Sequence, residues 1–218
     1  MDDLQIHVVE SLPFNENTYV VFLENRDDCL VIDPGMEPEL ILRLLEELDR
    51  RPAAILNTHG HGDHIAGNEA MKEAFPDAPL MIGVNEAHLL TDANANLTGL
   101  FGMPITSPSA DRLLKEGEVV EAAGIRLEVL EVPGHSPGHV VFVWRGTPSR
   151  VFGGDVLFER GIGRSDFPGC NGPLLLKGIR AKLFALPPET VVYPGHGSTT
   201  TIGAERAHNP FVGDNVRG

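Results

Sequence analysis

Short apolar runs alternate with amphipathic stretches along most of the 218-residue chain. The apolar runs are bounded by Gly, Pro, Asn or Asp, which is typical of β-strands that end in tight turns. The predicted strands are Gln5–Val9, Thr18–Leu23, Cys29–Ile32, Ala53–Leu56, Leu80–Ile82, Val119–Glu121, Ile125–Val132, Val140–Trp144, Arg150–Gly153 and Thr190–Tyr193.

The stretches between these runs have a helical period. The spacing of three and four residues that marks one helix face predicts an amphipathic helix, and the residues that show it are Leu40, Ile41, Leu44, Leu45 and Leu48. The predicted helices are Pro38–Arg50, Ile65–Phe75, Asn85–Leu90, Pro173–Leu186 and Ala204–Ala207. Thr91–Pro108 is rich in Asn, Gly, Pro and Ser, so it is predicted to be a long loop that covers a substrate or connects two elements. The alternation predicts an α/β protein.

Four of the predicted strands end in Gly-containing loops that carry possible metal ligands. Ala53–Leu56 leads into His59-Gly60-His61-Gly62-Asp63-His64. The ligand candidates after later strands are His135, Asp155 and His196. Loops at the ends of rigid strands are where proteins commonly place functional side chains. Three His and one Asp within six residues therefore indicate a metal site rather than a coincidence of surface histidines.

The spacing within the cluster suggests two ions. Alternate residues of a strand-to-helix loop can point the same way, so His59 and His61 can hold one ion together. Asp63 and His64 follow one turn later and can face a second ion. Imidazole and carboxylate ligands suit zinc, iron or manganese. Two neighbouring cations also need an anionic bridge, which the carboxylate of Asp155 can provide.

The composition of the chain narrows the classes of binding partner and the compartment that are expected. The formal net charge of −14 disfavours nucleic acid and anionic membrane surfaces. No stretch approaches 18 apolar residues, and the acidic start Met1-Asp2-Asp3 has no signal core, so a cytoplasmic protein is expected. The two cysteines make no disulfide framework: Cys29 is interpreted as a buried hydrophobe, and Cys170 as a possible exposed thiol in a Gly/Pro-rich loop.

The remaining histidines are ranked by position. His139 follows His135 closely and, like Asp33 and Thr58, is a candidate to support the ligands from behind. His7, His88 and His208 are interpreted as structural or surface residues.

Together these residues resemble the metallo-β-lactamase superfamily. The matching motifs are Thr58-His59-Gly60-His61-Gly62-Asp63-His64, Pro133-Gly134-His135-Ser136-Pro137-Gly138-His139, Gly154-Asp155 and Pro194-Gly195-His196-Gly197. The segments Gly163–Gly169 and Glu205–Phe211 are similar to the glyoxalase II-like branch. The resemblance implies one domain over residues 1–218, folded as a four-layer αββα sandwich. It also implies one ion on His59, His61 and His135, a second on Asp63, His64 and His196, and Asp155 as the bridge.

Two departures from the family pattern shape the functional expectation. Glyoxalase II enzymes hold glutathione with a C-terminal helical region, whereas this chain stops soon after Phe211. Asp155 argues against a zinc β-lactamase, which usually lacks an Asp at the bridging position.

The resemblance implies a dinuclear zinc hydrolase that cleaves a small-molecule thioester, such as S-lactoylglutathione, with a metal-bound hydroxide; iron or manganese could replace zinc. Asp63 is expected to orient the nucleophile as well as to bind metal. Arg164, Lys177 and Arg180 are candidate contacts for an anionic substrate, or else solvated charges.

Three alternatives stay open. A persulfide dioxygenase would use one iron on His59, His135 and Asp155, and a lactonase would use the same ligands as the thioester hydrolase. The third is a non-catalytic metal-binding scaffold. A nuclease is disfavoured by the acidic charge, and the sequence leaves the oligomeric state open.

Overall fold

The computed structural model describes residues 4–216, in which the first half of the chain builds one six-stranded sheet. Its order is β1-β2-β3-β4-β5-β6. The first three strands pair antiparallel, and β3 to β6 pair parallel. The strands are β1 (Leu4–Ser11), β2 (Glu16–Leu23), β3 (Asp28–Ile32), β4 (Arg51–Leu56), β5 (Leu80–Gly83) and β6 (Arg112–Leu114).

The second half builds another six-stranded sheet, in the order β14-β13-β10-β9-β8-β7. Its strands are β7 (Val119–Ala122), β8 (Ile125–Glu131), β9 (Val140–Trp144), β10 (Arg150–Gly154), β13 (Val191–Pro194) and β14 (Thr200–Thr201). A separate hairpin joins β11 (Leu157–Phe158) to β12 (Gly161–Ile162).

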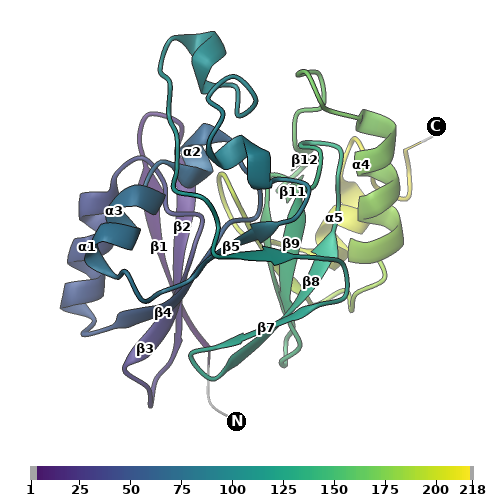
Figure 1. The fold of residues 1–218 in the computed structure, drawn as a ribbon. Helices are drawn as coiled ribbons and strands as arrows, with labels where there is room; N and C mark the ends of the chain where they lie inside the picture. Colours follow the sequence, from purple (N-terminus) through teal and green to yellow (C-terminus); the bar gives the residue numbers. More distant parts are fainter. Residues whose placement is uncertain (1–3, 217–218) are drawn as a thin grey trace.

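Helices cover the outer face of each sheet (Figure 1). On one side lie α1 (Pro38–Glu47) and α3 (Asn68–Ala74), and on the other lie α4 (Gly172–Gly178) and α5 (Ile202–His208). The largest apolar cluster takes residues from both sheets, including Leu56, Phe142 and Phe152, and so fills the space between them. Two further clusters pack the helices onto the outer faces. The predicted four-layer αββα sandwich is confirmed.

The strand directions bring the ligand loops to one edge of the sandwich. Because β9 is antiparallel to both β8 and β10, and β13 is parallel to β10, the strands β8, β10 and β13 run in the same direction and their C-terminal ends lie at the same edge. Glu16 of β2 forms an isolated β-bridge with His196 across the sheets, and the Asn17 backbone N–H donates to the Gly195 carbonyl at 2.7 Å. This tie holds the last ligand loop against the first sheet.

The predicted helix Ile65–Phe75 is wrong as a single element. Two helices stand there, α2 (Gly62–Ile65) and α3, and they meet at Gly67. The Gly67 N–H donates to the Pro34 carbonyl, and a Cβ atom at Gly67 would lie 2.8 Å from the Gly35 carbonyl oxygen. This close backbone contact interrupts the helix. As a result Asp63 and His64 lie in the short first helix.

The other differences are local. The predicted helix Asn85–Leu90 is a turn followed by the 3-10 helix η1 (Ala87–Leu90), and a second 3-10 helix, η2 (Thr98–Phe101), interrupts the predicted long loop. Helix α4 continues as a π-helical segment, η3 (Ile179–Leu183), and so ends before Leu186. Strands β6, β11, β12 and β14 are too short for a periodic signal and were not predicted. Among the described residues, no helix is long and apolar enough to cross a membrane.

Candidate metal centre

Three histidines from two loops form the first group of possible ligands, here called the three-histidine group: His59, His61 and His135. The first two follow β4 and the third follows β8. One ligand nitrogen from each lies within 4.8 Å of the others, and His61 Nδ1 is 2.9 Å from His135 Nε2. Since neither sheet supplies all three residues, the group exists only because the two sheets meet at this edge.

Asp63, His64 and His196 form the second group, again with ligand atoms within 4.8 Å. His196 Nε2 lies 3.3 Å from Asp63 Oδ2, and His64 Nε2 lies 3.9 Å from the same oxygen. Here the first turn of α2 provides two residues and the loop after β13 provides the third. The carboxylate gives this group one negative charge that the three-histidine group lacks.

Asp155 lies between the two groups and presents one oxygen to each. Its Oδ2 is 3.4 Å from His135 Nε2, whereas its Oδ1 is 3.4 Å from His64 Nε2 and 3.6 Å from His196 Nε2. Gly154 before it adopts φ +46°, and a Cβ there would lie 2.2 Å from Thr58 Oγ1, so the turn requires glycine. Burial would raise the pKa of Asp155, but the His64 imidazole and the other neighbouring histidines lower it below its ordinary value.

The rings are oriented by hydrogen bonds from the nitrogens that face away from the groups. His135 Nδ1 donates to the Arg164 carbonyl at 2.8 Å, His64 Nδ1 to Asp33 Oδ2 at 3.1 Å, and His196 Nδ1 to the Phe14 carbonyl at 3.0 Å. In each ring the Nε2 atom is then left to accept. Metal-binding histidines in proteins are commonly held in this way.

The buried polar atoms at the centre fit a pair of cations. His59 Nε2, His64 Nε2 and Asp155 Oδ1 are buried and have no hydrogen-bond partner among residues 4–216. Leaving such atoms unpaired is costly, so their convergence indicates that ions complete the site. Burial lowers the pKa of His59, and lowers that of His61 to about 3, which keeps both rings in the neutral form that binds metal.

Asp33, predicted from the sequence to support the ligands, lies directly behind them. Its carboxylate accepts from the Thr58 backbone N–H at 2.7 Å, from the Thr58 hydroxyl at 2.6 Å and from His64. Asp33, His59 and His64 also form a third compact grouping, but these hydrogen bonds occupy the Asp33 oxygens. His139 is fully buried, stacks on His59 with ring centroids 4.6 Å apart, and accepts from the Asp155 N–H.

The cationic candidates lie outside the ligand groups. Arg164 is exposed, donates twice to Asp166 and stacks over Phe167, so its carbonyl rather than its guanidinium contacts the cluster. Lys177 and Arg180 are exposed along α4 and η3 and line a separate surface hollow. Their proposed contact with substrate stays a prediction.

The other singled-out side chains lie as follows. Cys29 is buried, and His7 stacks on Phe22, whereas His88 and His208 are exposed. Cys170 is half-buried, with its thiol donating to the His135 carbonyl at 2.8 Å.

Two buried polar features behind the cluster have no motif in the sequence. The Asn57 amide donates to the His64 carbonyl at 2.9 Å and its oxygen accepts from Asn68. Glu86, fully buried, accepts from backbone N–H groups on both loops of the three-histidine group. Glu86 lies in a predicted helix with nothing nearby to mark it, so only the tertiary structure reveals it.

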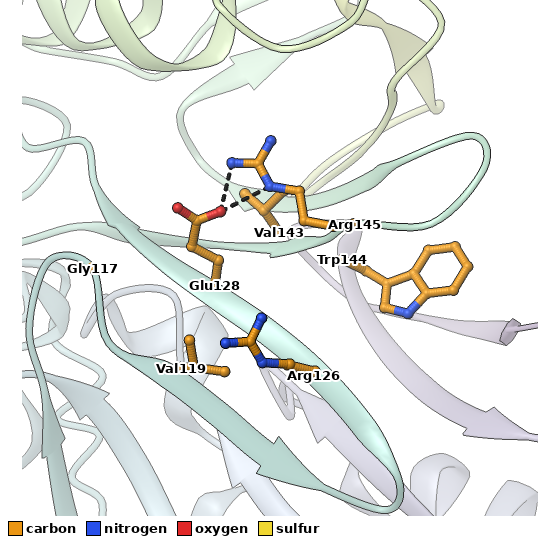
Figure 2. A pocket seen from close by; sticks show the side chains of 7 residues that line it. All are labelled: Gly117, Val119, Arg126, Glu128, Val143, Trp144 and Arg145. Carbon is orange, nitrogen blue, oxygen red and sulfur yellow. Dashed lines mark hydrogen bonds and ion pairs between the residues drawn. The ribbon is translucent and has the colours of Figure 1, made fainter.

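Figure 2 shows a groove elsewhere on the second sheet, lined by residues of β7, β8 and β9 and by Gly117 and Arg145 beside them. Arg145 there donates to the Glu128 carboxylate at 2.8 Å. The groove shares no residue with the two ligand groups, and its central carboxylate is neutralised by the arginine. It is therefore a surface feature separate from the candidate metal centre.

Comparison with known proteins agrees with this geometry. The family model described as "Metallo-beta-lactamase superfamily" matches residues 12–196. The chain is 39% identical to the "Probable metallo-hydrolase YqgX" of Bacillus subtilis, over 92% of this chain and 93% of that protein. It is 36% identical to the "Hydroxyacylglutathione hydrolase GloC" of Haemophilus influenzae, over 96% and 98%.

Solved structures give the same result. The structure of "BLEG-1 B3 metallo-beta-lactamase" has a TM-score of 0.91 at 36% identity, covering 95% of this chain and 99% of that one. "TTHA1623 in a di-iron-bound form" has a TM-score of 0.83 at 39% identity, covering 94% and 99%. The chain belongs to the metallo-beta-lactamase superfamily. Within this superfamily the chain is a metal-dependent hydrolase, and these similarities alone assign neither its metal nor its substrate.

Proposed function

We propose that this protein is a dinuclear metal hydrolase that cleaves small-molecule acyl thioesters. The observation that carries the proposal is Asp155, whose two oxygens each face a different group of three ligands. Two cations held there would acidify a shared water and polarise a carbonyl. Asp63, whose Oδ2 lies 3.3 Å from His196 Nε2, would bind the second ion and orient that water.

The thioester assignment has two supports. A thiolate leaves without being protonated, because a thiol titrates near 8.5, and so the site needs no separate acid. The 36%-identical relative over nearly the whole chain is named as a hydroxyacylglutathione hydrolase. The net charge of −14 favours a small molecule over a nucleic acid as the substrate.

Zinc is the proposed metal, and iron is the second candidate because the 39%-identical neighbour is described as di-iron-bound. A persulfide dioxygenase with one iron on His59, His135 and Asp155 would leave the second group without a role. The convergence of Asp63, His64 and His196 therefore favours the two-metal hydrolase.

The test combines metal analysis with a substrate panel. Mass spectrometry should find about two metal ions per chain, and thioesters including S-lactoylglutathione should be hydrolysed faster than a lactone or a β-lactam. The β-lactam belongs in the panel because the BLEG-1 neighbour is described as a lactamase. One iron per chain with oxygen uptake on a persulfide would overturn the proposal, as would a clear preference for the β-lactam.

The Asp63→Ala variant tests the role of one ligand. Loss of an outer hydrogen-bond partner costs a metal site about 10–100-fold in affinity or activity, so loss of a direct ligand should cost more than about 100-fold in thioester hydrolysis. Asp28→Ala, which removes an aspartate paired with Arg26 away from the cluster, is the matched control and should keep full activity. A fully active Asp63→Ala protein would remove this residue from the mechanism.

A further inference from the structure

Residues 83–90, which are the end of β5, the turn after it and η1, are called the corner here. The corner packs between the two loops that carry the three-histidine group. A Cβ atom at Gly60 would lie 2.4 Å from Leu89 Cβ, and one at Gly138 would lie 2.3 Å from Asn85 Cβ. Such spacing is possible only because both loops present glycine to the corner. The corner therefore packs directly against the backbone of both ligand loops.

Glu86 lies in this corner with its carboxylate fully buried. One oxygen accepts from the Gly60 N–H at 2.8 Å, and the other accepts from the Gly138 N–H at 2.5 Å. Hydrogen bonds from backbone N–H groups to a carboxylate are among the stronger ones in proteins. Each oxygen thus holds a different loop.

The two contacted glycines adjoin the ligands. Gly60 separates His59 from His61, and Gly138 lies in the turn that follows His135. We propose that Glu86 is a positioning residue that sets the separation of the two loops and so fixes the three-histidine group. The proposal rests on the metal-binding part of the proposed function and is independent of the substrate.

The second group has other anchors. His64 is held by Asp33 at 3.1 Å and through its carbonyl by the Asn57 amide at 2.9 Å. His196 is held by the Phe14 carbonyl. Since no hydrogen bond joins Glu86 to any of these residues, loss of its carboxylate should weaken the three-histidine group selectively.

A role in folding alone predicts a different result. Glu205 is an equally buried carboxylate that accepts from the Arg160 N–H at 2.9 Å and from the Thr200 hydroxyl at 2.6 Å, away from the ligands. Glu205→Gln therefore serves as the matched control for loss of a buried carboxylate. Glutamine at position 86 can accept from one N–H but turns an NH₂ group toward the other.

The experiment measures zinc affinity with a competing chelator in two backgrounds. His196→Ala disrupts the second group and leaves the three-histidine group, whereas His61→Ala does the reverse. Adding Glu86→Gln should weaken zinc binding about 10–100-fold in the His196→Ala background and less than about twofold in the His61→Ala background. Hydrogen exchange should also quicken at the Gly60 and Gly138 amides, and Glu205→Gln should change neither measurement.

The outcomes separate the two hypotheses. Equal weakening in both backgrounds, or no weakening in either, overturns the positioning role of Glu86 while the metal centre stands. If His61→Ala itself leaves zinc binding at the wild-type level and stoichiometry, the proposed metal centre fails and the Glu86 proposal fails with it. If Glu86→Gln does not fold, Glu86→Asp replaces it. Its shorter side chain cannot reach both loops, so it should weaken zinc binding with the same preference for the His196→Ala background.

Discussion

Asp33→Asn provides a sharp test of how the second ligand group is oriented. The wild-type carboxylate accepts from the Thr58 N–H, from the Thr58 hydroxyl and from His64 Nδ1. An amide of the same shape keeps the first bond and turns an NH₂ group toward the other two donors. His64 can then avoid a clash between two donors only by accepting at Nδ1, which moves its proton to Nε2. That nitrogen is the one that faces Asp155 at 3.4 Å.

The expected loss follows from this change of tautomer. A protonated Nε2 cannot bind a metal. The second group therefore loses a ligand unless His64 keeps its proton on Nδ1, where it would face the NH₂ group of the new amide unfavourably. Loss of such an orienting partner costs about 10–100-fold in metal affinity, or about 1.4–2.7 kcal/mol. Asp33 is only 2% exposed, so water cannot replace the lost acceptor. The effect on folding should be smaller, about 1–2 kcal/mol for the altered hydrogen bonds.

The assay is a zinc titration against a competing chelator in the His61→Ala background, in which the second group remains. Nitrogen NMR of the His64 ring reports the tautomer directly. Asp111→Asn is the control. Asp111 also accepts from a backbone N–H, that of Leu80, and from a side chain, the Lys72 ammonium group, but it lies away from the ligands. Unchanged zinc affinity in Asp33→Asn, or a His64 ring still protonated at Nδ1, would refute the reasoning.

Three further predictions concern the edge of the sandwich. Gly195→Ala places a Cβ atom 2.3 Å from Asp155 Oδ1 and should lose bound metal, so two ions per chain by mass spectrometry would contradict it. Gly67→Ala places a Cβ atom 2.8 Å from the Gly35 carbonyl oxygen and should cost about 1–3 kcal/mol, or about 2–12 °C in Tm. The control Gly161→Ala, with its nearest contact at 3.4 Å, should leave Tm unchanged. A chelator should remove the metal from protein kept at a free metal concentration of about 1,000 times Kd. The free energy of unfolding should then fall by about 4.1 kcal/mol and Tm by about 8–16 °C, and added zinc should restore both.

Most of the fold was accessible from the sequence because its strands are apolar runs with clear ends. The run around Ile55 and the run around Phe142 are buried on both faces, and such strands carry a strong signal. The candidate ligands were also accessible, because each follows such a run within a few residues. The spacing alone put His59 with His61 and Asp63 with His64, whereas the placing of His135 and His196 could be taken only from the family resemblance. The distances come only from the structure.

What the sequence could not predict depends on contacts between distant segments. The helix break at Gly67 comes from the backbone of residues 34 and 35, which no local period reveals. Glu86 is a similar case, because its partners lie 26 and 52 residues away along the chain. A buried carboxylate with backbone partners leaves no repeated pattern, so such residues emerge only when the loops are seen together.

The way the ligands are divided between the sheets has a mechanical consequence. Residues 59–64 follow the first sheet, whereas His135, Asp155 and His196 follow the second. Each group therefore takes ligands from both sheets, and a bound ion in either group would join them at this edge. Without ions, the links between the sheets at this edge include the bridge from β2 to His196, the Asn17 hydrogen bonds and the two hydrogen bonds of Glu86. Metal removal should consequently loosen this edge before the apolar core, and hydrogen exchange after chelation should rise first at Gly195 and its neighbours rather than in β3 or β9.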